Sequence, residues 1–410
     1  MGEVEYEPVS VKVVLAEMKD TAELLIDLSY SAVLLGSDDI AEEVLDLEDR
    51  MDILQMKARM SLLMAARNPE DAEALAPVLG VVGAAEKISD AAGDIAKVVI
   101  EEIGLPEAMR AALPEAVEML VRVRLDPDSP LVGQSLAGCD LETETGVRVI
   151  AIRREGEWLI DPDSDAVLRG KDVLLLRGTE EGIAEVYEES VGDEYVHMEA
   201  PEPAIDDLER AVDSIVLMKN MSELAVDLAY GAVLYDSEAV AEEVLELEAE
   251  VDALQSRFEA WTLQAASRID DPVSLRGLVH LARATEVISD AALEISEGVL
   301  RGLGTHPVVA EAVRESDQMI VRLTVGPESA LDGATLRDEM VSTQTGMRVI
   351  AVRRGSVAGT TAQSRFGRSR GEWVVSPRGE TELHAEDVII AKGTPEGADR
   401  LAALAGQELE

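Results

Sequence analysis

The sequence has few of the residues that staple small secreted proteins or carry most catalytic chemistry. It contains a single cysteine, Cys139, which excludes an internal disulfide framework. Its four histidines have no mutual spacing that fits a zinc site or a catalytic triad. Glycine-rich phosphate loops and the dinucleotide-binding fingerprint are also missing. The sequence therefore predicts a protein that is not an enzyme and is not gated by NAD or ATP.

Long apolar stretches are missing too. No segment approaches the roughly 18 uninterrupted apolar residues that a membrane-spanning helix needs. The N-terminal residues are acidic and form no apolar signal region. We expect a cytoplasmic protein, and any contact with the inner face of the membrane to go through a partner.

Basic and aromatic residues are scarce. The formal net charge is −47, aromatic residues make up 3%, and lysine supplies only eight of the 36 basic residues. Self-repulsion of such a chain is weakened where salt screens it, which predicts a salt-loving, archaeal source. An ordinary acidic protein is the alternative. The charge argues against binding to a nucleic acid polymer through phosphate contacts.

The chain repeats itself at an offset of 200 residues. Residues 27–30 (Asp-Leu-Ser-Tyr) return as residues 227–230 (Asp-Leu-Ala-Tyr), and residues 86–90 return in similar form as residues 286–290. Solenoid repeats have periods of about 20 to 50 residues, so this is a tandem duplication of one long unit. A duplication predicts an internal pseudo-dimer, in which a site that normally forms between two subunits forms within one chain.

The first part of each repeat has helical periodicity. Gly36 ends the first expected helix, and Ser37 is placed to cap the second, with Asp38 and Asp39 at its positive end. Three helices joined by short loops predict an antiparallel three-helix bundle. The apolar stripe of the second helix consists of Ile40, Val44, Leu47, Met51, Leu54 and Ala58.

The second part of each repeat has the sequence pattern of β-strands. Runs rich in β-branched residues, such as residues 146–152, predict a small α+β domain of about 70 residues. A domain of that size buries little core alone, which favours pairing between the copies. The predicted organisation is a helical bundle at 1–118, a small domain at 119–191, a linker at 192–204, a second bundle at 205–317 and a second small domain at 318–406 with an insertion at 356–370.

Acidic pairs recur in the helical parts. Each pair has the spacing Glu-x-x-x-Asp, which places two carboxylates one turn apart on one helix face. Two such pairs on neighbouring helices offer oxygen ligands for Mg²⁺, Ca²⁺, iron or manganese, whereas the alternative is a solvated acidic surface. The candidate metal ligands are Glu48, Asp52, Glu86, Asp90, Glu248, Asp252, Glu286 and Asp290.

The helical parts resemble PhoU-like proteins. Residues 85–92, followed by residues 94–96, resemble the signature helix of that family, and residues 47–52 resemble its second acidic motif. PhoU proteins are helical bundles that bind metal clusters through such motifs and regulate membrane transport. The resemblance therefore implies metal binding by the acidic pairs. PhoU usually holds two three-helix units in tandem, whereas another domain separates them here.

The strand-rich parts resemble the TrkA C-terminal domain, also known as the RCK C-terminal domain. In the first repeat the resemblance rests on residues 129–136, 146–154, 156–158 and 168–174. The second repeat keeps the strand at 346–354 but lacks the Pro-Leu-Val-Gly segment, and its insertion interrupts the hairpin.

This second resemblance implies a regulatory module of potassium and other cation channels and transporters. Such domains dimerise, and some members bind cyclic di-AMP or divalent ions at the dimer interface. Arginines would pair with ligand phosphates and isoleucines would pack on the bases, although the arginines can also simply face solvent. The candidate ligand-binding residues are Ile150, Arg153, Arg154, Ile350, Arg353 and Arg354.

The sequence thus predicts an α+β multidomain protein in which two PhoU-like three-helix bundles alternate with two TrkA-C-like domains about an internal pseudo-two-fold axis. The expected function is control of a membrane transporter or channel for potassium or magnesium by ligand sensing, as an internal pseudo-dimer or a homo-oligomer. The alternative is a PhoU-like, metal-binding regulator of phosphate transport.

Overall fold

The structure is a computed structural model of the 410-residue chain. It describes residues 11–104, 119–195, 206–301 and 319–407, apart from residues 140, 142–144, 161, 163, 179, 194, 236, 328, 356–372, 376 and 378 within those ranges. The predicted insertion at 356–370, and most of the predicted linker at 192–204, lie outside the described residues.

Each repeat begins with three long helices, as predicted. Ser37 and Ser237 cap the second helix of each bundle by accepting a hydrogen bond from the backbone N–H three residues later. The helices of the first repeat are α1 (Val11–Leu35), α2 (Asp38–Ala65) and α3 (Pro69–Ile100). Those of the second are α8 (Asp206–Tyr235), α9 (Glu238–Ala266) and α10 (Arg276–Leu300), the last preceded by the 3-10 turn η2 (Pro272–Leu275).

A four-stranded antiparallel sheet follows each bundle. The first has the order β1-β4-β2-β3 and the second the order β5-β8-β6-β7, so both have the same topology. The first sheet contains β1 (Met119–Arg124), β2 (Arg148–Arg154), β3 (Glu157–Ile160) and β4 (Val173–Gly178), with helices α5 (Leu136–Cys139) and α7 (Glu180–Val191). The second contains β5 (Met319–Thr324), β6 (Arg348–Arg353), β7 (Trp373–Val375) and β8 (Val388–Gly393), with helices α12 (Val341–Thr345) and α13 (Pro395–Leu404).

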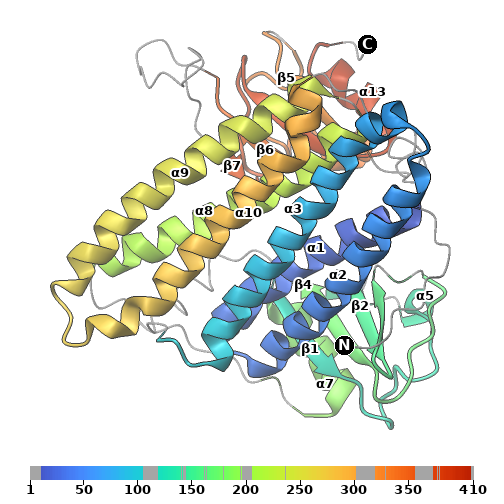
Figure 1. The fold of residues 1–410 in the computed structure, drawn as a ribbon, viewed down its shortest axis with the longest axis vertical. Helices are drawn as coiled ribbons and strands as arrows, with labels where there is room; N and C mark the ends of the chain where they lie inside the picture. Colours follow the sequence, from blue (N-terminus) through green and yellow to red (C-terminus); the bar gives the residue numbers. More distant parts are fainter. Residues whose placement is uncertain are drawn as a thin grey trace.

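The two bundles pack against each other mainly through α3 and α10 (Figure 1). These helices run antiparallel, because Pro77 approaches Gly298 at one end while the N–H of Gly277 donates to the carbonyl of Gly104 near the other. A second contact joins α1 to α8. Equivalent helices therefore meet in both contacts, as a pseudo-two-fold relationship between the repeats requires.

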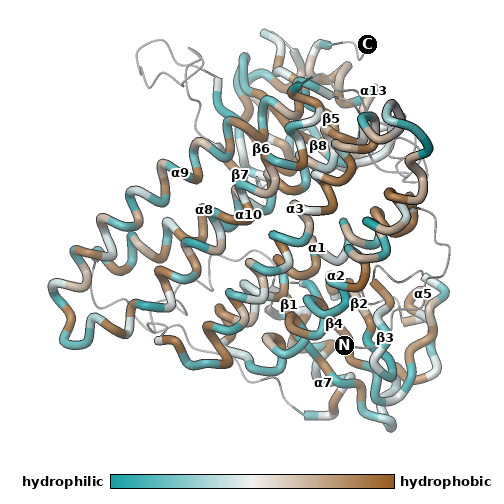
Figure 2. Tube along the Cα trace, viewed as in Figure 1, coloured by the Kyte–Doolittle hydropathy of each residue, from teal (hydrophilic) through white to brown (hydrophobic). Residues whose placement is uncertain are grey.

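One apolar core runs through both bundles, and each small domain has a further core on the far face of its sheet. Apolar and polar residues alternate along the helices in Figure 2, as expected of helices that bury one face. One face of each sheet also packs on the helical core, for example through Leu175 and Ala351. Among the described helices, none is long and apolar enough to cross a membrane.

The predicted fold class is confirmed. Helical bundles alternate with small α+β domains, and the arrangement is repeated. Each sheet lies against the helices of its own repeat, since β1 contacts α1 and α2 while β5 contacts α8 and α9. The candidate functional residues lie at this boundary between sheet and bundle.

Candidate functional site

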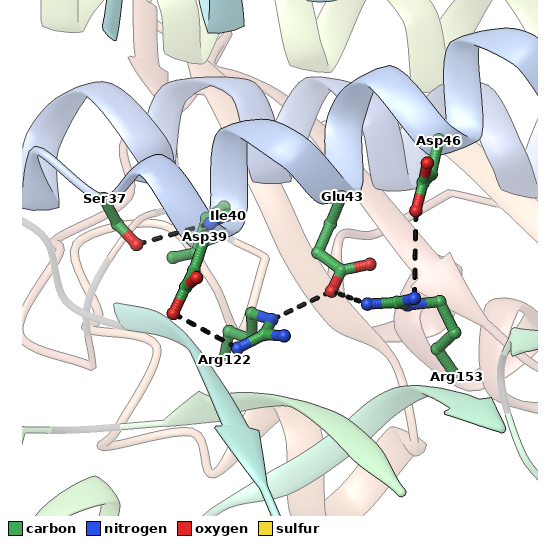
Figure 3. Close-up of polar contacts among 7 residues, drawn as sticks. All are labelled: Ser37, Asp39, Ile40, Glu43, Asp46, Arg122 and Arg153. Atoms are coloured by element: carbon green, nitrogen blue, oxygen red, sulfur yellow. Dashed lines mark hydrogen bonds and ion pairs between the residues drawn. The ribbon is translucent and has the colours of Figure 1, made fainter. Parts of the chain in front are cut away.

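A buried glutamate joins the first bundle to the first sheet. The side chain of Glu43 on α2 is only 2% exposed. Its Oε1 accepts a hydrogen bond of 2.9 Å from Nε of Arg122 on β1 and another from Arg153 on β2 (Figure 3). We call this group of three residues an arginine clamp, and we use the same name for its counterpart in the second repeat.

Strand alternation explains why both arginines face the helix. Side chains two residues apart on a strand share a face, so Arg122 lies on the face of Leu120, and Arg153 on that of Ala151. Leu120 and Ala151 both belong to the core that the sheet shares with the helices. The guanidinium of Arg153 also lies 6.0 Å from the centre of the Trp158 ring.

Two further carboxylates of α2 flank the clamp. Asp39 lies 3.3 Å from Nη1 of Arg122, and Asp46 lies 3.8 Å from Nη1 of Arg153 (Figure 3). Both aspartates are exposed, so these outer contacts are weak compared with the pairing to Glu43.

The second repeat builds the same clamp with better geometry. Glu243 on α9 accepts hydrogen bonds from Nε of Arg322 at 2.7 Å and from Arg353 at 2.8 and 2.7 Å. The pairing with Arg353 is bidentate, the strongest arrangement for an arginine and a carboxylate. Trp373 stands 5.9 Å from Arg353, as Trp158 does beside Arg153. In the first clamp, Oε2 of Glu43 has no hydrogen-bond partner among the described residues, so the second clamp is the tighter.

Each clamp ties a sheet to the bundle of its own repeat through a buried ion pair. A buried carboxylate is strongly destabilising when its partners are lost, so a movement that pulls the sheet from the helix has to provide another cation or water for the glutamate. An anion that drew the arginines away would leave the glutamate without its counter-charge in the same way.

The neighbouring arginines, Arg154 and Arg354, lie on the opposite face of their strands. Arg154 donates to both oxygens of Asp172, at 2.9 and 2.6 Å, and this hydrogen bonding raises the pKa of its guanidinium. Arg354 donates to Asp387 at 2.7 Å. Both aspartates are buried, so these pairs stabilise the small domains internally.

The predicted ligand residues therefore do not gather in one place. Arg153 faces the bundle while Arg154 faces away from it, and the same holds for Arg353 and Arg354. Ile150 and Ile350 are half-buried and pack against the helical core. Ligand binding by these six residues stays a prediction, and any single ligand on the bundle side of a sheet would meet only one arginine of each predicted pair.

The acidic pairs of the first bundle face each other across α2 and α3. Burial, together with the charges of Glu86 and Asp52, raises the pKa of Asp90. Two basic residues also lie on this face, since Arg59 contacts Glu86 at 2.9 Å and Lys97 lies 3.6 Å from Glu48. Arg59 and Lys97 therefore neutralise part of the negative charge on this face.

The acidic pairs of the second bundle have a different setting. Burial, together with Glu286 and Asp252, raises the pKa of Asp290, and Gln255 donates to Glu286 at 2.8 Å. The positions that hold Arg59 and Lys97 in the first repeat hold Glu259 and Glu297 in the second. Among the described residues, no three acidic, histidine or cysteine side chains form a cluster that fits a metal ion. Metal binding therefore stays a prediction, and the side chains as arranged do not form a finished site.

Glu43 and Glu243 were not among the candidates from the sequence. The signal that identifies them is their position, because Glu43 lies on the apolar stripe between Ile40 and Leu47. A charged residue on the buried face of an amphipathic helix, repeated 200 residues later, indicates a buried partner of opposite charge.

Family models match most of the chain. The PhoU domain model matches residues 15–99 and 215–299, and the TrkA-C domain model matches residues 120–190 and 320–406. The chain carries two PhoU domains and two TrkA-C domains. The resemblance expected from the sequence motifs is confirmed, and the arginine clamps lie where each TrkA-C domain meets its PhoU domain.

Solved structures with related domains have low sequence identity to this chain. The crystal structure of PhoU from Pseudomonas aeruginosa is 12% identical, with a TM-score of 0.41, and the match covers 75% of this chain and 96% of that one. The GsuK RCK domain is 14% identical, with a TM-score of 0.18, and the GsuK channel bound to NAD is 15% identical, with the same TM-score. The match spans 71% and 70% of this chain but only 64% and 53% of those two. A comparison with curated proteins finds no match.

Proposed function

We propose that this protein is a cytosolic regulatory subunit that controls a membrane transporter or channel for potassium or magnesium. Its TrkA-C domains sense a cytosolic ligand, and its PhoU domains transmit the signal to the partner. The observation that carries this proposal is the arginine clamp, which joins sheet to bundle through a buried glutamate in both repeats. The protein acts as a regulator and not as an enzyme.

The clamp supports a specific means of transmission. An anionic ligand such as cyclic di-AMP presents phosphates that compete with Glu43 or Glu243 for arginines, which bind both groups well. A ligand shifts the packing of sheet on helix only if it binds the arginines more tightly after they have left the glutamate than before. The first clamp, which is the looser, is expected to open before the second.

The output requires a partner in the membrane. The described helices include none that crosses a bilayer, and the chain combines PhoU domains with TrkA-C domains, whose families we associated above with the regulation of membrane transport. We place the protein at the inner face of the membrane, bound to its transporter as an internal pseudo-dimer or as a homo-oligomer of such units.

Uptake measurements in cells that lack the gene test this proposal. Uptake of potassium, magnesium and phosphate is followed after restoring the wild type, the clamp variant E43Q/E243Q, or the control D46N/E246Q, which alters neighbouring acidic residues of α2 and α9. We expect potassium or magnesium uptake to change in the deletion and in the clamp variant, but not in the control. Unchanged uptake of both cations in the deletion contradicts the proposal.

A second candidate is a PhoU-type regulator of phosphate transport that binds Mg²⁺, Ca²⁺, iron or manganese. The facing acidic pairs on α2 and α3, and on α9 and α10, favour it. In this case the TrkA-C domains only pair the repeats. Altered phosphate uptake in the deletion, with both cations unaffected, would support this candidate.

A further inference from the structure

The C-terminal half of α2 carries a second apolar stripe, on the side opposite its core-facing stripe. At 3.6 residues per turn, the core-facing stripe around Met51 and Ala58 and this second stripe lie about 180° apart on the helix. A helix buries one face in its bundle, and the side chains of the second stripe are exposed or half-buried, with Leu63 at 71% and Met64 at 64%. We call it the outer stripe, and it consists of Ile53, Met56, Met60, Leu63 and Met64.

The second repeat shows that a bundle of this kind folds without an outer stripe. In its own bundle α9 takes the place of α2, and it has the same serine cap and a matching buried face. At the five equivalent positions of α9, only Leu263 is a large apolar residue. The other four are small or polar, namely Ala253, Ser256, Ala260 and Gln264. Packing of the bundle therefore does not account for the outer stripe.

Methionine dominates the outer stripe. Met56, Met60 and Met64 follow one another at intervals of about one turn. Unbranched thioether side chains are flexible and polarizable, so they adapt to a partner and are common at binding surfaces. Contacts with an amphipathic helix use anchors at positions i, i+3 or i+4 and i+7, and Ile53, Met56 and Met60 have this spacing.

The outer stripe has the dimensions of one helix face. Ile53 and Met64 are eleven residues apart, which is about 17 Å along the axis, or three turns. A stable contact between two folded proteins buries about 800 Å² on each of them, more than five partly exposed side chains provide. The stripe thus fits a single helical segment better than a second copy of this chain.

Acidic residues continue this side of the helix towards its start. Asp38, Glu42 and Asp49 lie on the side of the outer stripe, and all three are exposed. Asp49 precedes Ile53 by about one turn, so the acidic residues adjoin the apolar ones. A partner that covers both parts has complementary charge if basic residues follow its apolar ones.

The cations near the outer stripe are engaged within the chain or half-buried. Arg50 donates a hydrogen bond of 2.5 Å to Glu17, and Arg59 donates one of 2.9 Å to Glu86. Lys57 is half-buried at the edge of the stripe. The charge that this side of α2 offers to a partner is therefore mainly negative.

An anionic lipid surface fits this side of α2 poorly. Helices that lie on such membranes flank their apolar face with lysine and arginine. Here Glu42 and Asp49 would approach the lipid head groups together with the stripe, and the whole chain carries a net charge of −47. The same charges attract a basic partner.

We propose that the outer stripe of α2 is a docking surface for a basic, amphipathic helix of a partner protein. The apolar anchors of that helix pack on Ile53, Leu63 and the three methionines, and its basic residues face Glu42 and Asp49. The surface is separate from both arginine clamps. The proposal does not rest on control of cation uptake, because any partner with such a helix binds here.

Binding of a model helix tests the proposal. The probe is a fluorescently labelled peptide of about 18 leucine and lysine residues, with the leucines on one helical face. A peptide of the same composition in scrambled order is the control. Salt at about 1 M shortens the Debye length to about 3 Å and so weakens non-specific attraction to the acidic chain. We expect fluorescence anisotropy to show that the full-length wild type binds the amphipathic peptide about tenfold more tightly than the scrambled one.

A matched variant replaces the outer stripe with residues that the fold accepts. I53A/M56S/M60A/M64Q introduces the residues that α9 has at the equivalent positions. The control L263A removes an exposed leucine of the second bundle. We expect the variant to bind the amphipathic peptide about tenfold more weakly than the wild type, and L263A to bind it like the wild type.

Nuclear magnetic resonance of isotope-labelled methionine methyl groups gives a readout in the wild type itself. We expect the signals of Met56, Met60 and Met64 to shift when the peptide is added, while that of the buried Met51 stays in place. Equal affinity for the scrambled peptide, equal affinity of the folded variant, or shifts confined to other methionines would overturn the proposal. Binding to anionic lipid vesicles without binding of the peptide would overturn it in favour of a membrane contact.

Discussion

Tyr30 on α1 and Thr285 on α10 share a hydrogen bond of 2.5 Å between their hydroxyl groups, across the boundary between the two repeats. The threonine hydroxyl in turn donates to the carbonyl of Leu281 at 2.7 Å. The equivalent tyrosine of the second repeat, Tyr230, is buried, and its hydroxyl has no hydrogen-bond partner among the described residues. The reason is visible in the sequence, because Ala85 stands where the second repeat has Thr285.

Removing the two tyrosine hydroxyls should therefore have unequal effects. Tyr30→Phe loses a buried hydrogen bond and should lower the free energy of unfolding by about 1 kcal/mol. Tyr230→Phe removes a hydroxyl that is buried without a partner, so it should be neutral or slightly stabilising. Chemical denaturation at constant salt measures both. Equal losses for the two variants would contradict the asymmetry.

Restoring the missing partner should stabilise the protein. Ala85→Thr places a hydroxyl at the position equivalent to Thr285, and we expect the free energy of unfolding to rise by up to about 1 kcal/mol. Ala85→Val is the matched control, since it adds the same volume without the hydroxyl. The gain should also vanish in A85T/Y230F. If Ala85→Val stabilises as much as Ala85→Thr, packing and not hydrogen bonding is responsible.

Breaking a clamp should cost more than removing an exposed ion pair. Glu43→Gln and Glu243→Gln each leave two arginines of the sheet without their buried counter-charge, and we expect a loss of about 2 to 3 kcal/mol for each. Asp46→Asn removes a carboxylate that is 61% exposed, so its effect should stay below about 0.5 kcal/mol. Because its pairing is bidentate, Glu243→Gln should be the more damaging of the two clamp variants. Thermal unfolding of the three variants gives this order directly.

Divalent metal, if bound, should prefer the second bundle. Arg59 and Lys97 compete with a metal ion on the first acidic face, whereas the second repeat has Glu259 and Glu297 at those positions. Glu297 is paired with Arg301, and Lys87 of the first bundle is the cation that acts on Asp290. We expect Mn²⁺ to raise the unfolding temperature of the wild type and of E86Q/D90N, and to have less effect on E286Q/D290N. Titration calorimetry with the same variants serves as a check. A larger loss in E86Q/D90N would refute the assignment.

Much of the architecture follows from local patterns. The 200-residue offset, the change from helical to strand periodicity and the Ser37 cap all depend on residues close together in the chain, and each is confirmed. The PhoU and TrkA-C resemblances depend on short motifs that survive in both repeats.

The polar contacts between distant elements could not be predicted from local sequence patterns. Glu43 lies 110 residues from Arg153, and Tyr30 lies 255 residues from Thr285, so their pairing depends on how whole elements are packed. The opposite faces taken by Arg153 and Arg154 do follow from strand alternation, but the sequence alone does not say which face meets the helices. That choice comes from the packing of each sheet on its bundle.

We propose that the protein acts on a cation transporter in the membrane. Purification of the tagged protein from its native membranes in concentrated salt, followed by identification of the proteins that remain bound, tests this most directly. We predict that a potassium or magnesium transporter or channel is recovered with the wild type. Recovery of a phosphate transporter instead, or of no membrane protein at all, would contradict the account.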